Sequence, residues 1–281
     1  MPRVSSLHIY PIKSCRGLDL KAVRFDMLGP AYDRRFMLVD GDGCFLTQRE
    51  ESRLALVEPA LGPTSLQVKA PGMPVLKIGQ ASKDARRLEV SIWKDRGEAE
   101  DVGEHAASWF SQFLGRPCRL VRFPEGAVRP VDPDYARFDA ATALADGFPV
   151  LLTTTASLEQ LNQRLQPPVP MNRFRPNVVV EDCEPFAEDS WRQIRIGELV
   201  LDVVKPCARC TMVNVDQLRG RRLEQPLSAL AEFRKRDNEV FFGQNCIHHS
   251  FGSIRVGDEV EVLESNPKVA IAGEPSDSGQ K

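Results

Sequence analysis

The sequence predicts a mainly β protein, a β-rich α+β fold divided into two domains. Through roughly the first 120 residues, short apolar runs alternate with turn residues, as in small barrels and sandwiches. Strand-like runs return after a segment rich in Pro, Asp and Ala at 124–148. A regular alternation of strands and helices is absent, which disfavours a doubly wound sheet. The chain has 281 residues, enough for each domain to bury its own core.

We expect residues 1–123 to form an N-terminal β-barrel-like domain. Its strand-like runs are VSSLHIYPI, LKAVRFDML, RFMLVDGDG, CFLTQR, LALVEPAL, TSLQVKA, PVLKIG and RLEVSIWKD. A DG pair within VDGDGCFLT predicts a hairpin turn, because glycine accepts the positive φ that tight turns require. The helical spacing of apolar residues in GEHAASWFSQFL predicts a short helix over 103–114, ending at Gly115.

Residues 124–148 are interpreted as a linker or long loop, and a second domain is expected at 149–265. Its first strand, FPVLLTTT, precedes the amphipathic helix ASLEQLNQRLQ, with Leu158, Leu161 and Leu165 on one face and prolines at 167–168 as its stop. The remaining strands are NVVVE, IRIGELVLDVVKP, TMVNVD, VFFGQNCIHH and IRVGDEVEVL, and LSALAEFRKR predicts another helix. The polar tail, 266–281, is expected to be disordered.

Composition restricts the class of protein. A 42% hydrophobic and 27% charged chain is typical of globular proteins, and no apolar run approaches the roughly 18 residues of a membrane span. The N-terminus has no apolar segment of a secretory signal. A formal net charge of −2 gives no reason to expect nucleic-acid binding. Seven cysteines, an odd number, favour reduced thiols and a cytoplasmic location.

The segment KPCARC places Cys207 and Cys210 three residues apart. Structural zinc needs four ligands, and Cys246 and His248 in NCIHH could complete such a site. A redox pair would favour a helix N-terminus, whereas strand-like runs flank this motif on both sides. Two cysteines in a tight turn without a ligand are the third reading, and the motif alone leaves all three open.

Two further clusters suit an anion. In NRFRPNVVV, Arg173 and Arg175 bracket Phe174 just before a proline and a buried strand, so two guanidiniums could grip a phosphate or carboxylate. In YPIKSCRG, Lys13 and Ser14 follow a strand and a proline, where an ammonium, a hydroxyl and backbone amides could hold an anion. Either cluster alone is also compatible with an ordinary solvated loop.

Together these motifs resemble the MOSC family. The matching segments, in order along about 1–263, are LHIYPIKSCRGLDL, RRFMLVD, LTQRE, NRFRPNVVV, EDSW, KPCARC, FGQN and RVGDEVEVL. The resemblance is closest to the two-domain members with an N-terminal β-barrel domain, the mitochondrial amidoxime reducing component and the bacterial YcbX-type proteins. It implies that the second domain is a MOSC β-barrel with a few helices.

The resemblance further implies a molybdenum cofactor, in which a pterin dithiolene and one cysteine thiolate ligate the metal. The matching cysteine is Cys210, a soft ligand that suits this metal. The residues that the resemblance places around the cofactor are Lys13, Ser14, Arg35, Thr154, Ser157, Arg173, Arg175, Asn177, Arg209 and Asp216, with Gln244 as a further match. Thr154 and Ser157 stand where a helix N-terminus would favour an anion.

The activity implied by the resemblance is the reduction of N-hydroxylated small molecules, such as amidoximes, hydroxylamines and N-hydroxylated bases, at the Cys210-ligated metal. No plant-type iron–sulfur motif follows residue 263, so we expect electrons from a separate protein, a flavoprotein or a cytochrome b5-like or ferredoxin-like carrier. Neither nucleic acid nor a membrane is expected as a partner. Alternatives are a carrier module for the cofactor or its sulfur, and a zinc-stabilised binding module.

Overall fold

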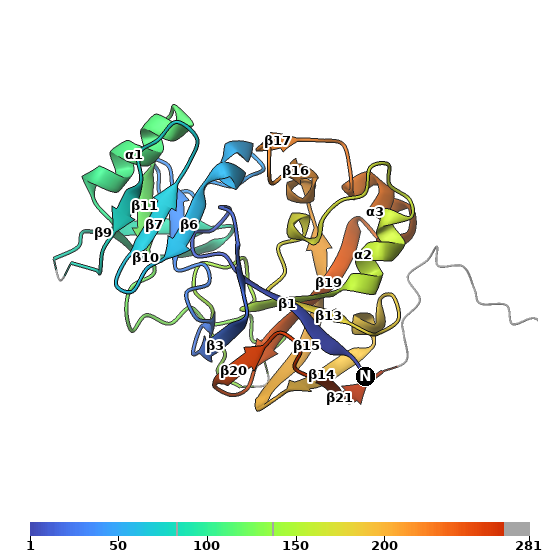
Figure 1. The fold of residues 1–281 in the computed structure, drawn as a ribbon. Helices are drawn as coiled ribbons and strands as arrows, with labels where there is room; N and C mark the ends of the chain where they lie inside the picture. The colour runs from blue at the N-terminus through green and yellow to red at the C-terminus, as the bar shows by residue number, and fades with distance from the viewer. Residues whose placement is uncertain (83, 137, 267–281) are drawn as a thin grey trace, which may run out of the picture.

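The computed structural model describes residues 1–82, 84–136 and 138–266. Strands greatly outnumber helices in this part of the chain, which confirms the mainly β fold class (Figure 1). No helix within it is both long and apolar enough to cross a membrane. The predicted disordered tail, 266–281, lies outside the described residues except for its first position.

The largest sheet has nine strands and carries most of the second half of the chain. In spatial order it contains β2 (Leu18–Leu20), β1 (Arg3–Ile9), β13 (Val178–Glu181), β12 (Val150–Thr154), β19 (Glu239–His248), β15 (Leu199–Arg209), β14 (Trp191–Ile196) and β21 (Val260–Ser265), and β18 (Lys235–Arg236) also pairs with β19. β1 lies antiparallel to β13, with Val4 opposite Val180. The N-terminal strand therefore belongs to the sheet of the second half, and the domain boundaries at 123 and 148 stay predictions.

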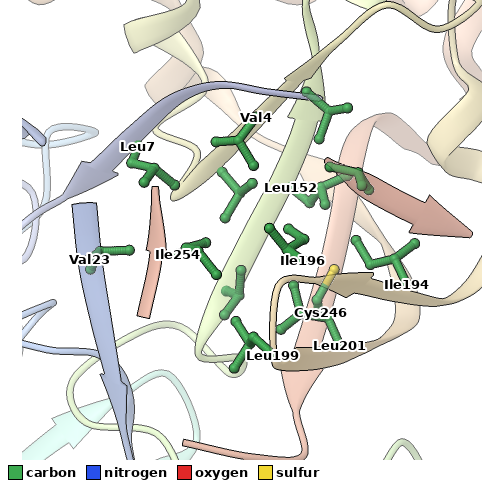
Figure 2. Packing of buried hydrophobic residues seen from close by; sticks show 14 of the residues in the cluster. Val4, Leu7, Val23, Leu152, Ile194, Ile196, Leu199, Leu201, Cys246 and Ile254 are labelled. Atoms are coloured by element: carbon green, nitrogen blue, oxygen red, sulfur yellow. The ribbon is translucent and has the colours of Figure 1, made fainter. Parts of the chain in front are cut away.

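A core of buried apolar side chains forms between this sheet and a smaller one, from which Val23 and Ile254 contribute (Figure 2). β12 is buried at all five positions, which explains why its sequence is a continuous apolar and threonine run rather than an alternating one. Cys246 of β19 is fully buried and packs in the same cluster as Ile194 and Leu201. Sulfur here acts as a small apolar side chain.

Two helices cover one end of this sheet (Figure 1). α2 (Thr155–Asn162) connects β12 to β13, which run parallel, so the chain contains one strand–helix–strand crossover. α3 (Leu227–Arg234) packs with α2 in a cluster that includes Leu161 and Leu230. Both helices end before their predicted last residues. After α2, turns lead to the prolines at 167–168, and after α3, Lys235–Arg236 join the sheet as β18.

The first half forms smaller sheets with a separate core. They are β5 (Phe36–Val39), β11 (Arg119–Arg122), β10 (Asp95–Asp101) and β9 (Arg87–Ile92) in one sheet, and β6 (Glu58–Leu61), β7 (Leu66–Lys69) and β8 (Leu76–Ile78) in another. α1 (Glu104–Leu114) packs on this core and ends at Gly115 in the left-handed conformation, as predicted. Gly43 takes a φ of 78° in the predicted DG turn.

The remaining short elements connect the halves. They are β3 (Ala22–Asp26), β4 (Gly29–Pro30) and β20 (Gly252–Arg255) in one sheet, β16 (Val215–Asp216) and β17 (Arg221–Arg222) in another, and the 3-10 turns η1 (Ser52–Leu56), η2 (Met171–Arg173), η3 (Ala187–Asp189) and η4 (Thr211–Asn214). The described residues of 124–148 form no named helix or strand, in keeping with a long loop. Leu144 of this loop nevertheless packs in the first-half core.

Three predicted strands are wrong in part. The run CFLTQR forms only isolated bridges at Cys44 and Phe45 and then turns, where the Gln48 side chain donates to the Ser14 carbonyl. The run LALVEPAL begins as η1 and becomes a strand only at Glu58, because Leu54 and Ala55 reach the core from a helical turn that the Glu51 side chain caps. TMVNV begins as η4, where the Asn214 side chain accepts from Leu227 N and donates to the Glu224 carbonyl. Tertiary hydrogen bonds thus override local β propensity.

Candidate functional site

A cavity of about 740 Å³ opens where the two halves meet. Residues of the first half, of the 129–148 loop and of the second half all line it. Nine lysine and arginine side chains but only four acidic ones contribute to the lining, although the whole chain has a formal net charge of −2. Positive charge is therefore concentrated at this cavity, as an anionic ligand requires.

Both cysteines of the CxxC segment line the cavity. Cys207 lies near the end of β15, and Cys210 follows it as the residue that begins η4. Each sulfur accepts from a guanidinium: Arg49 Nη1 lies 3.4 Å from Cys210 Sγ, and Arg209 Nη1 lies 2.8 Å from Cys207 Sγ. The motif thus presents two thiols, each beside a cation, to one cavity.

The zinc reading does not fit this arrangement. Cys246 is fully buried in the apolar core, and His248 Nε2 bonds to the carbonyl oxygen of Asp26. Within the described ranges no three His, Cys, Asp or Glu side chains are grouped so that they could hold a metal. His248 is buried like Cys246, whereas His249 is exposed.

Arg173 and Arg175 are buried at the cavity, with only 5% and 6% of their surface exposed. Arg173 donates to the Val213 carbonyl, and Arg175 donates to the Cys15 carbonyl and stacks on the ring of Tyr10. Neither guanidinium forms an ion pair with a carboxylate of the described residues. Burial lowers the pKa of Arg175 to about 10. Asp216 and Asp33 lie close enough to favour the charged forms of Arg173 and Arg175, respectively, but neither carboxylate pairs directly with them. Buried cations without a direct ion pair are costly, and a bound anion would offset that cost.

Lys13 and Ser14 lie at the same cavity. Lys13 Nζ donates to the Leu144 carbonyl at 2.9 Å and to Asp146 Oδ1 at 2.6 Å. Burial lowers the pKa of this ammonium, while Asp146 acts in the opposite direction. The loop predicted as a linker therefore supplies partners for Lys13 and closes one side of the site.

Strained backbone gathers around this cavity. Four of its lining residues, Ser14, Arg34, Trp93 and Arg175, have φ between 46° and 65°. Left-handed conformations of non-glycine residues cost free energy and are concentrated at functional sites.

Arg35, which the resemblance pointed to, does not line the cavity; its neighbour Arg34 does. Arg35 pairs with Asp26 at 2.7 Å. Arg34 donates to Asn177 Oδ1 at 3.0 Å and pairs with Asp33. Asn177 lines the cavity too, and its amide oxygen accepts from Arg34.

Thr154, Ser157 and Asp216 do not line the cavity either. Thr154 caps α2, and its hydroxyl lies 2.6 Å from that of Ser157. Both hydroxyls donate to Glu188, a fully buried carboxyl whose pKa burial and the neighbouring Asp189 raise to about 7. Asp216 accepts from Leu218 N and Arg219 N and pairs with Arg219. These internal hydrogen bonds occupy the groups that had been expected to face the cofactor.

Gln244 is likewise engaged within the protein, where its amide donates to Asp189 Oδ1 at 2.6 Å. In contrast, Arg49 and Trp93 line the cavity but were not selected from the sequence. Arg49 lies within the LTQRE segment of the resemblance, which was the available signal.

Comparison with known proteins identifies the family of this chain. The family model "MOSC N-terminal beta barrel domain" matches residues 1–117, and the model "MOSC domain" matches residues 139–261. Mitochondrial amidoxime-reducing component 1 of Homo sapiens is 32% identical over 92% of this chain and 82% of its own length. Mitochondrial amidoxime reducing component 2 of Rattus norvegicus is 35% identical with the same coverage. Molybdenum cofactor sulfurase of Danio rerio is 30% identical over 88% of this chain, which spans 32% of that protein.

Proposed function

Because the chain belongs to the MOSC family, with the N-terminal β-barrel domain ahead of the MOSC domain, we propose that it is a molybdenum-cofactor-dependent oxidoreductase of N-hydroxylated compounds. Amidoximes, hydroxylamines and N-hydroxylated bases are the proposed substrates. The amidoxime-reducing names of two relatives that cover almost the whole chain support this class. The observation that carries the proposal is a thiol and two buried guanidiniums, neither in a direct ion pair, in one cavity of the described residues.

The side chains present fit the proposed cofactor. Its phosphate is a dianion, and Arg173 and Arg175 are buried cations that form no direct ion pair in the described part of the chain. Arg34 adds a third guanidinium to the same cavity and donates to the Asn177 side chain. Its metal takes thiolate ligands, and Cys210 presents a sulfur at the cavity.

Each residue then has a defined task. Cys210 would ligate the metal, while Arg49 donates to the same sulfur and offsets its negative charge. Arg173, Arg175 and Arg34 would bind the phosphate. When bound, the cofactor would supply two-electron removal of oxygen from nitrogen, chemistry that no side chain provides. The protein contributes binding, orientation and a fixed electrostatic environment.

The overall change is balanced by two electrons and two protons. An amidoxime loses its hydroxyl oxygen as water, and its N–O bond is replaced by an N–H bond in the amidine. We propose that a separate electron-donor protein, a flavoprotein or a cytochrome b5-like or ferredoxin-like carrier, supplies the electrons. We likewise propose a cytoplasmic location, on the basis of the seven free cysteines.

The proposal is tested by the metal content and turnover of the purified chain. The protein is made in cells that synthesise the cofactor, and molybdenum and zinc are measured by mass spectrometry beside the Cys210→Ser variant. We expect near-stoichiometric molybdenum that disappears in the variant, and reduction of benzamidoxime with reduced viologen as donor. Absence of molybdenum from well-folded protein, or zinc in its place, would contradict the proposal.

A second candidate is a carrier that binds the cofactor or its sulfur without turnover. The match to molybdenum cofactor sulfurase over 88% of this chain favours it. A carrier would contain molybdenum, fail to reduce benzamidoxime and release its cofactor to an acceptor protein. A reductase would turn over with the cofactor retained.

A further inference from the structure

We propose that Trp93 and Asp146 form a subsite for planar amidine-type groups carried on an aromatic ring, which assigns aryl amidoximes as the preferred substrates. The inference rests on the proposed function and specifies its substrate class. Both residues line the cavity that contains Cys210. They come from different parts of the chain, since Trp93 lies at the turn between β9 and β10 and Asp146 lies in the 129–148 loop.

Trp93 is placed unusually for so large an apolar side chain. It is 55% exposed, whereas Trp109 and Trp191 are each 4% exposed. Its φ of 57° is one that tryptophan rarely adopts in a tight hairpin turn, where Asn or Gly is normal. A left-handed turn position and a half-exposed surface are both unfavourable for tryptophan. A role in ligand binding would explain why tryptophan occupies this position.

The indole is held in place by a hydrogen bond and by contacts with Phe45 and Arg49. Trp93 Nε1 donates to Asp146 Oδ1 at 3.1 Å, and Lys13 Nζ donates to the same oxygen at 2.6 Å. In the described part of the chain Asp146 Oδ2 has no hydrogen-bond partner, and the carboxylate side chain is 56% exposed. A charged acceptor therefore stands beside an oriented aromatic face, with one oxygen available for a ligand.

Arg49 demonstrates what the indole face accepts. Its guanidinium, a planar cation with N–H donors, lies 4.2 Å from the ring centroid of Trp93. The same group donates to Cys210 Sγ at 3.4 Å. One arginine head group contacts both the indole face and the sulfur, so Trp93 lies within the length of a small planar group of Cys210.

The chemistry of the two groups selects the ligand. A carboxylate oxygen accepts N–H bonds from an amidoxime or from the amidinium that its reduction leaves. The indole face attracts planar cations and stacks against aromatic rings. An alkyl amidine can donate N–H bonds to the carboxylate but has no aromatic ring to stack on the indole. A hydroxylamine without a ring or an amidine group makes neither interaction fully.

The test compares benzamidine with acetamidine, which carries the same cation without the ring, on the purified full-length chain. We expect benzamidine to quench tryptophan emission in a saturable way, because Trp93 is exposed and the other two tryptophans are buried. By calorimetry it should bind about threefold to tenfold more tightly than acetamidine. Trp93→Leu should abolish this preference, and Trp93→Phe should retain part of it.

Asp146→Asn should weaken both amidines by a similar factor. Asp95→Asn is its matched control, since Asp95 lines the same cavity but pairs with Arg129. Thermal unfolding verifies that each variant is folded. Equal binding of the two amidines, or a ring preference that survives in Trp93→Leu, would overturn the subsite.

Failure of the subsite and failure of the proposed function give different results. The binding measurements involve no turnover, so they can support the subsite even in protein that reduces nothing. If the protein does turn over, the ratio of kcat/KM for benzamidoxime to that for acetamidoxime should fall in Trp93→Leu. Turnover with an unchanged ratio would reject the subsite alone.

Discussion

Arg175 shows how a single residue can indicate a missing partner. Its guanidinium is buried and stacked on Tyr10, and its backbone has a φ of 57°, yet no carboxylate of the described residues forms a direct ion pair with it. Desolvated charge and a strained backbone both oppose folding. Such a residue is retained in a stable protein where a ligand compensates the cost.

We therefore predict that Arg175→Gln loses most of its molybdenum, on the order of tenfold, while its thermal unfolding changes little. Arg35→Gln is the matched control, because Arg35 pairs with Asp26 and does not line the cavity. Metal content and melting temperature are measured for both variants. Equal retention of molybdenum in the two variants would remove Arg175 from the phosphate site.

The two thiols of the CxxC segment should respond differently to substitution. Cys210 contacts Arg49 from the first half of the chain, whereas Cys207 contacts Arg209 of its own strand. On the single-ligand assignment, Cys210→Ser abolishes molybdenum-dependent activity and Cys207→Ser leaves a measurable part. Benzamidoxime reduction per bound molybdenum distinguishes them. Equal loss in both variants would contradict a single sulfur ligand.

Glu188 should make stability fall as pH rises. Burial raises its pKa from 4.5 to about 7, so the folded protein binds this proton more strongly than the unfolded chain. The stabilisation is fully present below pH 4.5 and is lost as pH rises through about 7. Across that pH range the free energy of unfolding should fall by on the order of 3 kcal/mol. Glu188→Gln should abolish this pH dependence.

The check is urea unfolding at about pH 5 and about pH 8. Glu184→Gln is the control, because Glu184 lies in the same loop but is exposed. It should keep the pH dependence of the unsubstituted protein. An identical fall in stability for Glu188→Gln would show that another group is responsible.

Single residues also show where sequence reasoning stopped. The RR pair at 34–35 was identified, but spacing cannot tell which arginine enters the cavity, since neighbouring residues point in different directions. Only the pairing of Arg35 with Asp26, a tertiary contact, decides it. The resemblance assigned Thr154 and Ser157 to the cofactor. Nothing in the local sequence indicated that both hydroxyls donate to the buried Glu188.

At the scale of elements, β19 depends on a glycine at its centre. Gly243 has a φ of 77°, and a Cβ there would lie 2.7 Å from the Leu152 carbonyl and 2.7 Å from Thr153 Cγ2 of β12. Backbone atoms cannot give way cheaply, so the strand must shift.

Gly243→Ala should therefore destabilise the protein by about 2–4 kcal/mol. Gly197→Ala, in the turn between β14 and β15, is the control: its φ is 58°, but a Cβ there meets no atom within 4 Å. That variant should lose only about 1 kcal/mol for the left-handed backbone. Equal losses in denaturant unfolding would show that contact with β12 is unimportant.

The spacing of apolar residues was sufficient to predict some helices and strands but not others. The buried run of β12 and the amphipathic α1 follow directly from their residues. η1 and η4 do not, because side-chain caps and buried hydrogen bonds outweigh the β propensity of LALV and TMVNV. Sheet order was beyond local pattern as well, since the pairing of β1 with β13 joins residues far apart in sequence.

For the whole molecule, the resemblance led correctly to a β-rich chain of the MOSC family, and the structure places Cys210 at a cationic cavity. The resemblance did not indicate that the 129–148 loop contributes to the cavity. That loop contributes Asp146 and the Leu144 carbonyl to Lys13, and packs Leu144 in the first-half core. A segment without regular structure is thus tied to the cavity by long-range contacts.

The sheet pairing makes a final prediction about how the molecule divides. β1 covers the edge of β13, and Val4, Leu7, Ile9, Val23 and Phe25 lie in the core of the larger sheet. Burial of five such side chains is worth on the order of 10 kcal/mol, which is comparable to the whole stability of a domain. A fragment of residues 124–266 should therefore fail to fold alone, with an unpaired strand edge that favours aggregation.

Residues 1–28, which contain β1, β2 and β3, should rescue that fragment when joined to it through a long flexible linker. The rescued protein should be monomeric and unfold cooperatively, as measured by circular dichroism and size-exclusion chromatography. Replacing Leu7 with Asp in the added segment should abolish the rescue, because it puts a charge in the core. Cooperative unfolding of residues 124–266 alone would instead show that the second half is independent of the N-terminal strands.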